Sequence, residues 1–194
     1  MEQYRKTLLI NVNECKSMSL ISINVDDSYV STAIVNAQEI YLPTLIGTAL
    51  YHRMQELVYN EINHKSPRIY DSQYSVYNEC LQEYIKPLLK YRTAIDLMYN
   101  ISFKIRNIGT VKNSDTNVNY PDITEIKYLE KQYSTYYNTY CERLSKFLKT
   151  NIDSIPELKS DVPIYFDKAS IDKKYANDGG LWLGSDDKNN CECI

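Results

Sequence analysis

One apolar stripe of helical period constrains this chain more than any other feature. It follows Asp122-Ile123-Thr124-Glu125, which resembles a capping box because the acid stands three residues after the cap. The stripe extends over about 27 residues, which corresponds to ~40 Å of helix at ~1.5 Å per residue. Its members are Ile126, Leu129, Tyr133, Tyr136, Tyr140, Leu144 and Phe147. A helix of this length needs other helices to cover its apolar side, so the pattern predicts a helical bundle.

Two shorter stripes upstream predict a helical hairpin. An acidic cap at Asp26 or Asp27 opens the first helix, and Pro43 is expected to stop it because the residue before a proline is pushed out of helical geometry. The second helix begins at about Thr48, after a tight corner at 45–47. The two stripes are Val30, Ile34, Ala37 and Tyr41, then Leu50, Met54, Leu57, Val58 and Ile62.

A third helix is predicted from Asp71 or Ser72 to Ser102. Pro87 falls inside its pattern and either kinks one long helix or occupies the first turn of a new one. The helical period then breaks over Phe103–Lys112, where apolar and basic residues alternate and Gly109 offers a turn. This stretch is expected to form a short strand or a hairpin-like excursion.

Composition agrees with one mainly α domain flanked by two arms. The chain has 194 residues, and its 5 glycines and 6 prolines are too few for the frequent turns of a sandwich or barrel. We expect an extended arm over 1–25, a small helical bundle over 26–151, and an irregular acidic C-terminal arm over 152–194. The net charge of −3 gives no global excess of positive charge for holding nucleic acid or an anionic membrane.

The sequence predicts no catalytic, cofactor or metal site. It contains no glycine-rich phosphate loop and no nucleophile elbow. Glu61 and His64 form a single E-x-x-H, whereas a di-metal carboxylate bundle needs two such motifs, so a metal enzyme using this pair is only a rival hypothesis. The odd number of scattered cysteines predicts reduced thiols rather than a disulfide framework.

Two features point toward partners. No acid lies between Asp96 and Asp115, and the excursion there carries Lys104, Arg106, Asn107, Val111 and Lys112. It is either a basic finger or an ordinary solvated hairpin. A basic finger would bind DNA phosphates or an acidic groove on a protein. Trp182, with Leu181 and Leu183 between glycines, is either an anchor for another chain or a cover for the domain's own core.

No stretch approaches the ~18–20 apolar residues of a membrane helix, and Asn11 breaks the apolar run at the N-terminus. We therefore expect no membrane partner and a protein made in the cytoplasm.

Three stretches together resemble a known family. Residues 34–51 (IVNAQEIYLPTLIGTALY) resemble the A-Q-x-x-x-(I/L)-x-P-x-L-G-x-x-L-Y corner of tailed-phage head–tail connector proteins. Residues 102–111 (SFKIRNIGTV) resemble a stretch of connector-like ring proteins from phages of Bacteroidetes, including the crAss-like group. The end of the long helix, 143–151 (RLSKFLKTN), fits the same set.

This resemblance implies a structural virion protein without catalytic residues. It implies a homo-oligomeric ring of twelve copies beneath the portal protein, at the neck of a virion assembled in the host. The ring would join the portal to the next ring or tail protein and line the channel for packaged DNA. The excursion at 103–112 would face the portal or the lumen, and Leu181, Trp182 and Leu183 would anchor one subunit to another. The alternative left open is a helical nucleic-acid-binding regulatory protein.

Overall fold

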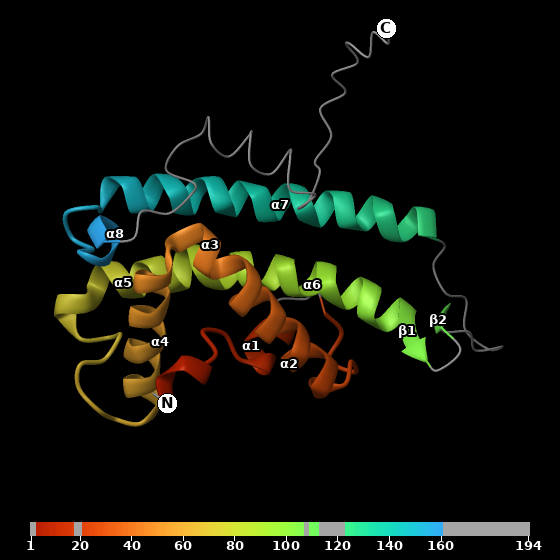
Figure 1. Cartoon of the computed structure of the whole chain (residues 1–194), viewed down its shortest axis with the longest axis horizontal. Coiled ribbons are helices and arrows are strands. Elements are labelled where there is room, and N and C mark those ends of the chain that lie inside the picture. Colours follow the sequence, from red (N-terminus) through yellow and green to blue (C-terminus); the bar gives the residue numbers. More distant parts are fainter. Residues whose placement is uncertain (1–2, 18–20, 107–108, 113–122, 161–194) are drawn as a thin grey trace, which may run out of the picture.

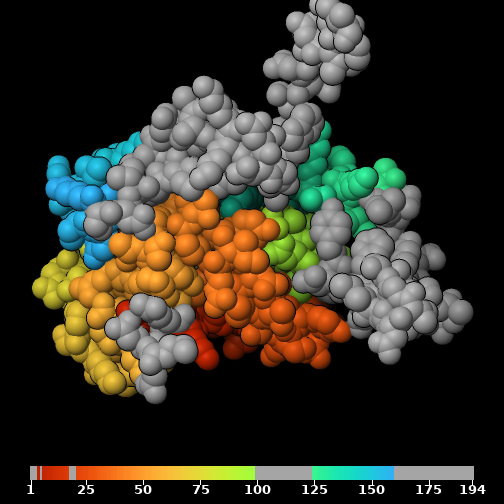
Figure 2. Space-filling model, viewed as in Figure 1, coloured from red at the N-terminus to blue at the C-terminus, as the bar shows by residue number. Residues whose placement is uncertain are grey.

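Two long helices form the spine of the molecule. The computed structural model describes residues 3–17, 21–106, 109–112 and 123–160. Helix α7 (Ile123–Thr150) lies along α6 (Lys86–Ser102), and helices α2 (Asp27–Asn36), α3 (Leu42–Ile46) and α4 (Thr48–Ile62) lie across one side of this pair (Figure 1). In the space-filling view the orange surface of α2 to α4 covers much of α6 (Figure 2). The fold is mainly α, as predicted.

The first helical hairpin turns at a glycine, not at the proline. The expectation that Pro43 stops the first helix is wrong, because the chain continues from α2 through a π-helical turn (Ala37–Tyr41) into α3. The wider π turn accommodates a residue that has no N–H to donate and whose ring crowds the preceding turn. Gly47 ends α3 with φ 81°, a left-handed conformation that favours glycine, and α4 begins at the next residue.

Pro87 is accommodated in the same way. The short helix α5 (Ser75–Glu79) follows a 3-10 turn at Ser72–Tyr74 and passes into a second π-helical turn (Cys80–Ile85), after which α6 begins. Pro87 is the second residue of α6, just as Pro43 is the second residue of α3. Of the two predicted roles, Pro87 therefore has the second: it occupies the first turn of a new α-helical segment. A π turn joins this segment to the helix before it.

The predicted excursion is a β-hairpin. Strands β1 (Phe103–Arg106) and β2 (Gly109–Lys112) pair antiparallel, with Phe103 opposite Lys112 and Lys104 opposite Val111. The hairpin follows directly from the end of α6 (Figure 1).

The expected N-terminal extended arm is wrong. Residues Gln3–Lys6 form a 3-10 turn, and α1 (Val12–Lys16) begins at a capping box in which Asn11 and Glu14 bond reciprocally. The apolar residues that suggested strand alternation are buried in the helical core: Leu9, Ile10 and Ile21 are each at most 6% exposed.

The boundary expected at residue 152 also falls too early. Ile155 and Leu158 are fully buried and belong to the main core cluster. Leu158 lies on the short helix α8 (Glu157–Ser160), which packs near α4 at the end of α7 (Figure 1). The helical domain therefore extends at least to α8, and the remaining arm, 161–194, lies outside the described residues.

Helix α7 buries most of the stripe that its sequence predicts, with two exceptions. Tyr137, Cys141, Leu144 and Leu148 are buried, whereas Leu129 is 39% and Tyr136 is 42% exposed. Ile126, Leu144 and Phe147 of the stripe are buried and Tyr133 and Tyr140 pack against the core, so only Leu129 and Tyr136 of the predicted stripe lie at the surface. No helix among the described residues has the length and apolar character needed to cross a membrane.

Candidate functional site

The β1–β2 hairpin assembles most of the predicted contact residues. Lys104 and Val111 are a cross-strand pair, Arg106 is opposite Gly109, and Lys112 is opposite Phe103. Lys104, Arg106, Val111 and Lys112 thus all lie on the two short strands of this hairpin, which follows the end of α6 (Figure 1). Asn107 lies outside the described residues. In this register Lys104, Arg106 and Val111 fall on one side of the ladder and Lys112, opposite Phe103, falls on the other. The hairpin thus carries basic residues, which attract an anionic partner.

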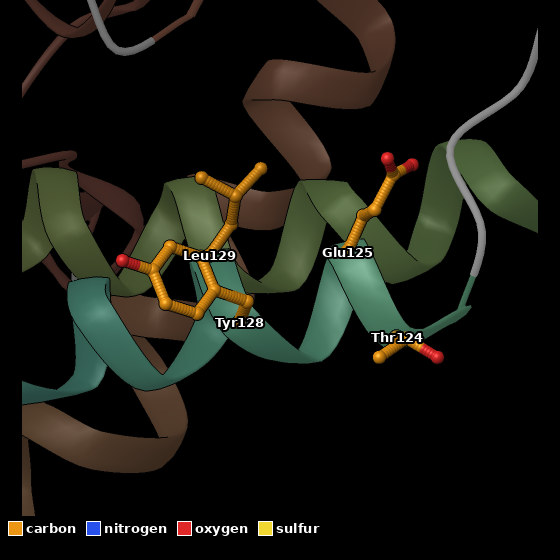
Figure 3. A pocket seen from close by; sticks show the side chains of 4 residues that line it. All are labelled: Thr124, Glu125, Tyr128 and Leu129. Carbon is orange, nitrogen blue, oxygen red and sulfur yellow. The ribbon is translucent and has the colours of Figure 1, made fainter.

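A shallow apolar depression lies at the start of α7. It is lined by Thr124, Glu125, Tyr128 and Leu129. Leu129 and Glu125 extend from the same side of α7, one turn apart, and the ring of Tyr128 lies across the helix beside Leu129 (Figure 3). Tyr128 is 72% exposed, so an aromatic ring stands on the surface without burial. Two large apolar side chains are therefore exposed next to each other at this end of α7.

A tyrosine cluster joins α6 to α7, and its α7 members follow the depression residues along the chain. The ring of Tyr91 contacts those of Tyr136, Tyr140 and Tyr133, with centroids 5.3, 5.8 and 6.3 Å apart. Burial, followed by the neighbouring tyrosines, raises the pKa of Tyr91. Part of the unusual tyrosine content thus holds the helix pair together.

A buried amide clasp holds the N-terminal segment on α2–α4. Gln38 accepts from the Leu9 N–H at 2.7 Å and donates to the Thr7 carbonyl at 2.9 Å. Gln55 donates to the same carbonyl at 3.2 Å and to the Tyr51 hydroxyl at 3.0 Å. Burial raises the pKa of Tyr51, so its hydroxyl stays protonated. Gln38 and Tyr51 are both residues of the connector-like motif at 34–51.

An ionic cluster holds α8 in the same way. Arg53 on α4 bonds to Glu56 at 2.5 Å and to the Tyr74 hydroxyl at 2.9 Å, and its Nε lies 3.7 Å from Glu157. The Tyr77 hydroxyl donates to the other oxygen of Glu157 at 2.7 Å. Burial, with the nearby Glu157 carboxylate, raises the pKa of Tyr77. The cluster fixes the C-terminal end of the domain against α4 and α5.

Two cations on α6 are buried in the core. Lys90 is 2% exposed, and within the described ranges its Nζ has no hydrogen-bond partner. Burial lowers the pKa of Lys90, because the charged ammonium loses its water there. Arg92 lies 3.9 Å from the centre of the Tyr41 ring and bonds to Tyr41 and Asp96. Arg92 thus joins α6 to Tyr41, and both cations are too enclosed to meet a large partner.

The residues of the metal-enzyme rival do not converge on a site. His64 is exposed, in a left-handed conformation just after the end of α4. Over the part of the chain that the structure describes, no group of three or more His, Cys, Asp or Glu side chains could hold a metal ion.

A family model places the chain among known sequences. The model of a family of unknown function, DUF6712, matches residues 42–162. The chain belongs to the DUF6712 family. Neither the curated proteins nor the solved structures contain a match. The DUF6712 match includes the hairpin and α8, in agreement with the buried position of Ile155 and Leu158.

Sequence reasoning missed the clasp and the depression. Gln38 and Gln55 are polar residues among apolar stripes, and a polar residue on the apolar side of a helix is the signal that could have identified them. The depression at the start of α7 was missed because an apolar stripe predicts burial of all its members. The stripe does not show which of them stay exposed to solvent. Leu181, Trp182 and Leu183 lie outside the residues that the structure describes in this DUF6712 protein.

Proposed function

We propose that this DUF6712 protein is a structural virion component, a connector that assembles as a ring beneath a portal protein and joins phage head to tail. The proposal also holds that it carries out no catalysis. It starts from the resemblance of residues 34–51, 102–111 and 143–151 to head–tail connector proteins.

The observation that carries the proposal is the placement of the hairpin. A connector must present a defined element to the portal above it or to the DNA inside it. The basic residues Lys104, Arg106 and Lys112 lie on one short hairpin beyond the end of α6, so they can enter a groove or face a lumen without disturbing the helices. The negatively charged DNA backbone or an acidic groove of the portal would attract this element.

The connector-like corner also has a defined structural role. Gly47 makes the turn between α3 and α4, and Tyr51, in the first turn of α4, contributes to the clasp that holds the N-terminal segment. A motif that builds a rigid scaffold supports an assembly role, since ring subunits must keep one shape to close head-to-tail.

A double charge reversal tests the proposal. Lys104→Glu with Arg106→Glu is expected to weaken attachment to the portal protein encoded in the same genome by at least about tenfold, which corresponds to ~1.4 kcal/mol. Co-purification and biolayer interferometry would measure it. The matched control is Lys65→Glu with Lys146→Glu, which makes the same change in net charge at two exposed positions on other elements.

Equal attachment of both variants would contradict the proposed role of the hairpin. Tight, salt-dependent binding of the isolated protein to DNA, lost in the hairpin variant, would instead favour the nucleic-acid-binding regulator.

A further inference from the structure

The start of α7 has the properties of a docking surface. Tyr128 is 72% and Leu129 is 39% exposed, while Ile126 between the capping residues and this pair is only 3% exposed. The depression lined by these two side chains with Thr124 and Glu125 is predominantly apolar (Figure 3). Leaving such groups in water is unfavourable, so burial by an occupant would be stabilising.

Both signs of charge occur at the depression, because Glu125 is part of its lining and two lysines lie beside it. Lys127 and Lys131 are exposed next to Tyr128 and Leu129. Along the whole of α7 the exposed charged side chains are Lys127, Lys131, Arg143, Lys146, Lys149, Glu125 and Glu142. Cations therefore predominate on the outer side of this helix, and an acidic segment with an apolar centre would fit it.

The C-terminal arm contains a segment of that description. Leu181, Trp182 and Leu183 stand between Asp178 on one side and the Asp186-Asp187 pair on the other. Its apolar centre matches the depression in character, and its flanking acids complement Lys127 and Lys131. Tryptophan is also among the residues that contribute most to binding when they enter a pocket.

Distance favours a neighbouring copy as the source of the segment. The described chain ends at α8, near the end of α7 opposite to the depression (Figure 1). The 28 residues of α7 give a helix about 42 Å long. A random coil of the 21 residues from 160 to 181 would span about 25 Å on average, and the same number of residues spans ~70 Å when fully extended. Docking on its own α7 would require stretching this connection, whereas a copy packed alongside can bring its depression closer.

We propose that Leu181-Trp182-Leu183 of one copy docks on the Tyr128 and Leu129 depression of a neighbouring copy, with Asp178, Asp186 and Asp187 facing Lys127 and Lys131. This inference rests on the proposed function in one respect, because it requires that copies of the chain assemble with one another. The docked segment would be a contact that joins two copies.

Intrinsic fluorescence of the full chain tests the docking, because Trp182 is the single tryptophan. In the unmodified protein we expect emission typical of a buried indole. Leu129→Asp is expected to shift the emission to longer wavelength and to increase quenching by acrylamide. Ile62→Asp is the matched control, since Ile62 is a 64% exposed apolar residue on another helix. Lys127→Glu with Lys131→Glu is a second variant that leaves the apolar core untouched and should give a shift in the same direction.

A mixing experiment tests that the docking joins two copies. The Leu129→Asp protein retains Trp182 but has a damaged depression, and the Trp182→Phe protein has an intact depression but no tryptophan. Refolded together with the second protein in excess, they should recover the short-wavelength emission, because Trp182 of one copy can reach the depression of the other.

Three results would overturn the inference. Emission of an exposed indole in the unmodified protein, or equal shifts in the Leu129→Asp and Ile62→Asp proteins, would exclude docking at this depression. A shift in the Leu129→Asp protein without recovery on mixing would assign the docking to the same chain and exclude the neighbouring copy. Recovery on mixing in a protein that does not bind the portal would contradict the proposed function and leave this inference standing.

Discussion

Buried polar side chains define how the ends of the chain attach to the helices. Gln38 is 1% and Gln55 is 0% exposed, and each bonds to the backbone of the N-terminal segment. A buried amide with all its partners fixes one arrangement, because any other arrangement leaves unpaired groups in the core. At the residue level, this gives Gln38 and Tyr51 of the stretch at 34–51 a structural role.

Removing the central amide should loosen the N-terminal segment. In Gln38→Leu the Leu9 N–H loses its acceptor while buried, which predicts a loss of about 1–3 kcal/mol in the free energy of unfolding. Urea denaturation followed by circular dichroism measures it. Gln132→Leu is the control, because Gln132 is exposed on α7 and should change stability by less than ~0.5 kcal/mol. Equal effects at the two positions would contradict the role of the clasp.

Alkaline pH should destabilise the fold through its buried thiols. Burial raises the pKa of Cys15 from 9.0 to about 11 and that of Cys141 to about 12, and it also raises the pKa of Cys80. Between pH 9 and 11 the unfolded chain releases these protons and the folded chain keeps them, so stability falls as pH rises, by up to about 1.4 kcal/mol per pH unit for each thiol.

Urea denaturation at a series of pH values measures this slope. Cys15→Ala should make it shallower between pH 9 and 11. A stability that stays constant or rises over this interval would show that the thiols ionise equally in both states.

At the level of elements, the sequence indicated where helices form better than where they end. Val30, Ile34 and Ala37 are fully buried, as their spacing predicts. Pro43 was expected to end that helix because local rules exclude proline from a regular α-helix. A π turn removes this conflict, and its formation depends on packing between helices that sequence spacing does not reveal.

The corner between α3 and α4 should depend on Gly47 more than on Pro43. Gly47→Ala places a Cβ at φ 81° and is expected to cost about 1–2 kcal/mol. Pro43→Ala, four residues earlier, requires no unusual backbone conformation and should cost less. Thermal unfolding of the two variants compares them directly, and a larger loss in Pro43→Ala would contradict the assignment of the turn to the glycine.

The orientation of α7 was the least predictable property of the candidate surface. Its stripe could be found from Ile126, Tyr133 and Leu144, but tyrosine is amphipathic and fits either the core or the surface. Tyr137 is 6% exposed and Tyr136 is 42% exposed, although the two are adjacent. Which one turns inward depends on the approach of α6, so the exposed depression could not be predicted from spacing. The hairpin could be predicted, because alternation and Gly109 are local signals.

At the level of the whole molecule, both ends of the described chain close the core. The N-terminal segment supplies Leu9 and Ile10, and the C-terminal segment supplies Ile155 and Leu158, none more than 2% exposed. Glu157 adds polar contacts to α4 and α5. The helical domain therefore includes residues that the sequence pattern assigned to the N-terminal and C-terminal arms.

Truncation should reveal this boundary. A chain ending at residue 160 is expected to stay folded, whereas a chain ending at 154 loses Ile155, Glu157 and Leu158 and should lose at least about 4 kcal/mol, a large part of the ~5–15 kcal/mol typical of a domain. Urea denaturation of the two truncated chains measures the difference. Equal stability would show that α8 contributes nothing to the core.

The mass of the particle in solution, with and without the portal protein, tests the central proposal most directly. Native mass spectrometry or light scattering of the full chain mixed with its portal protein should show a complex containing one ring of connector copies, with twelve as the expected number. A chain that remains a single copy in the presence of an assembled portal would contradict the account.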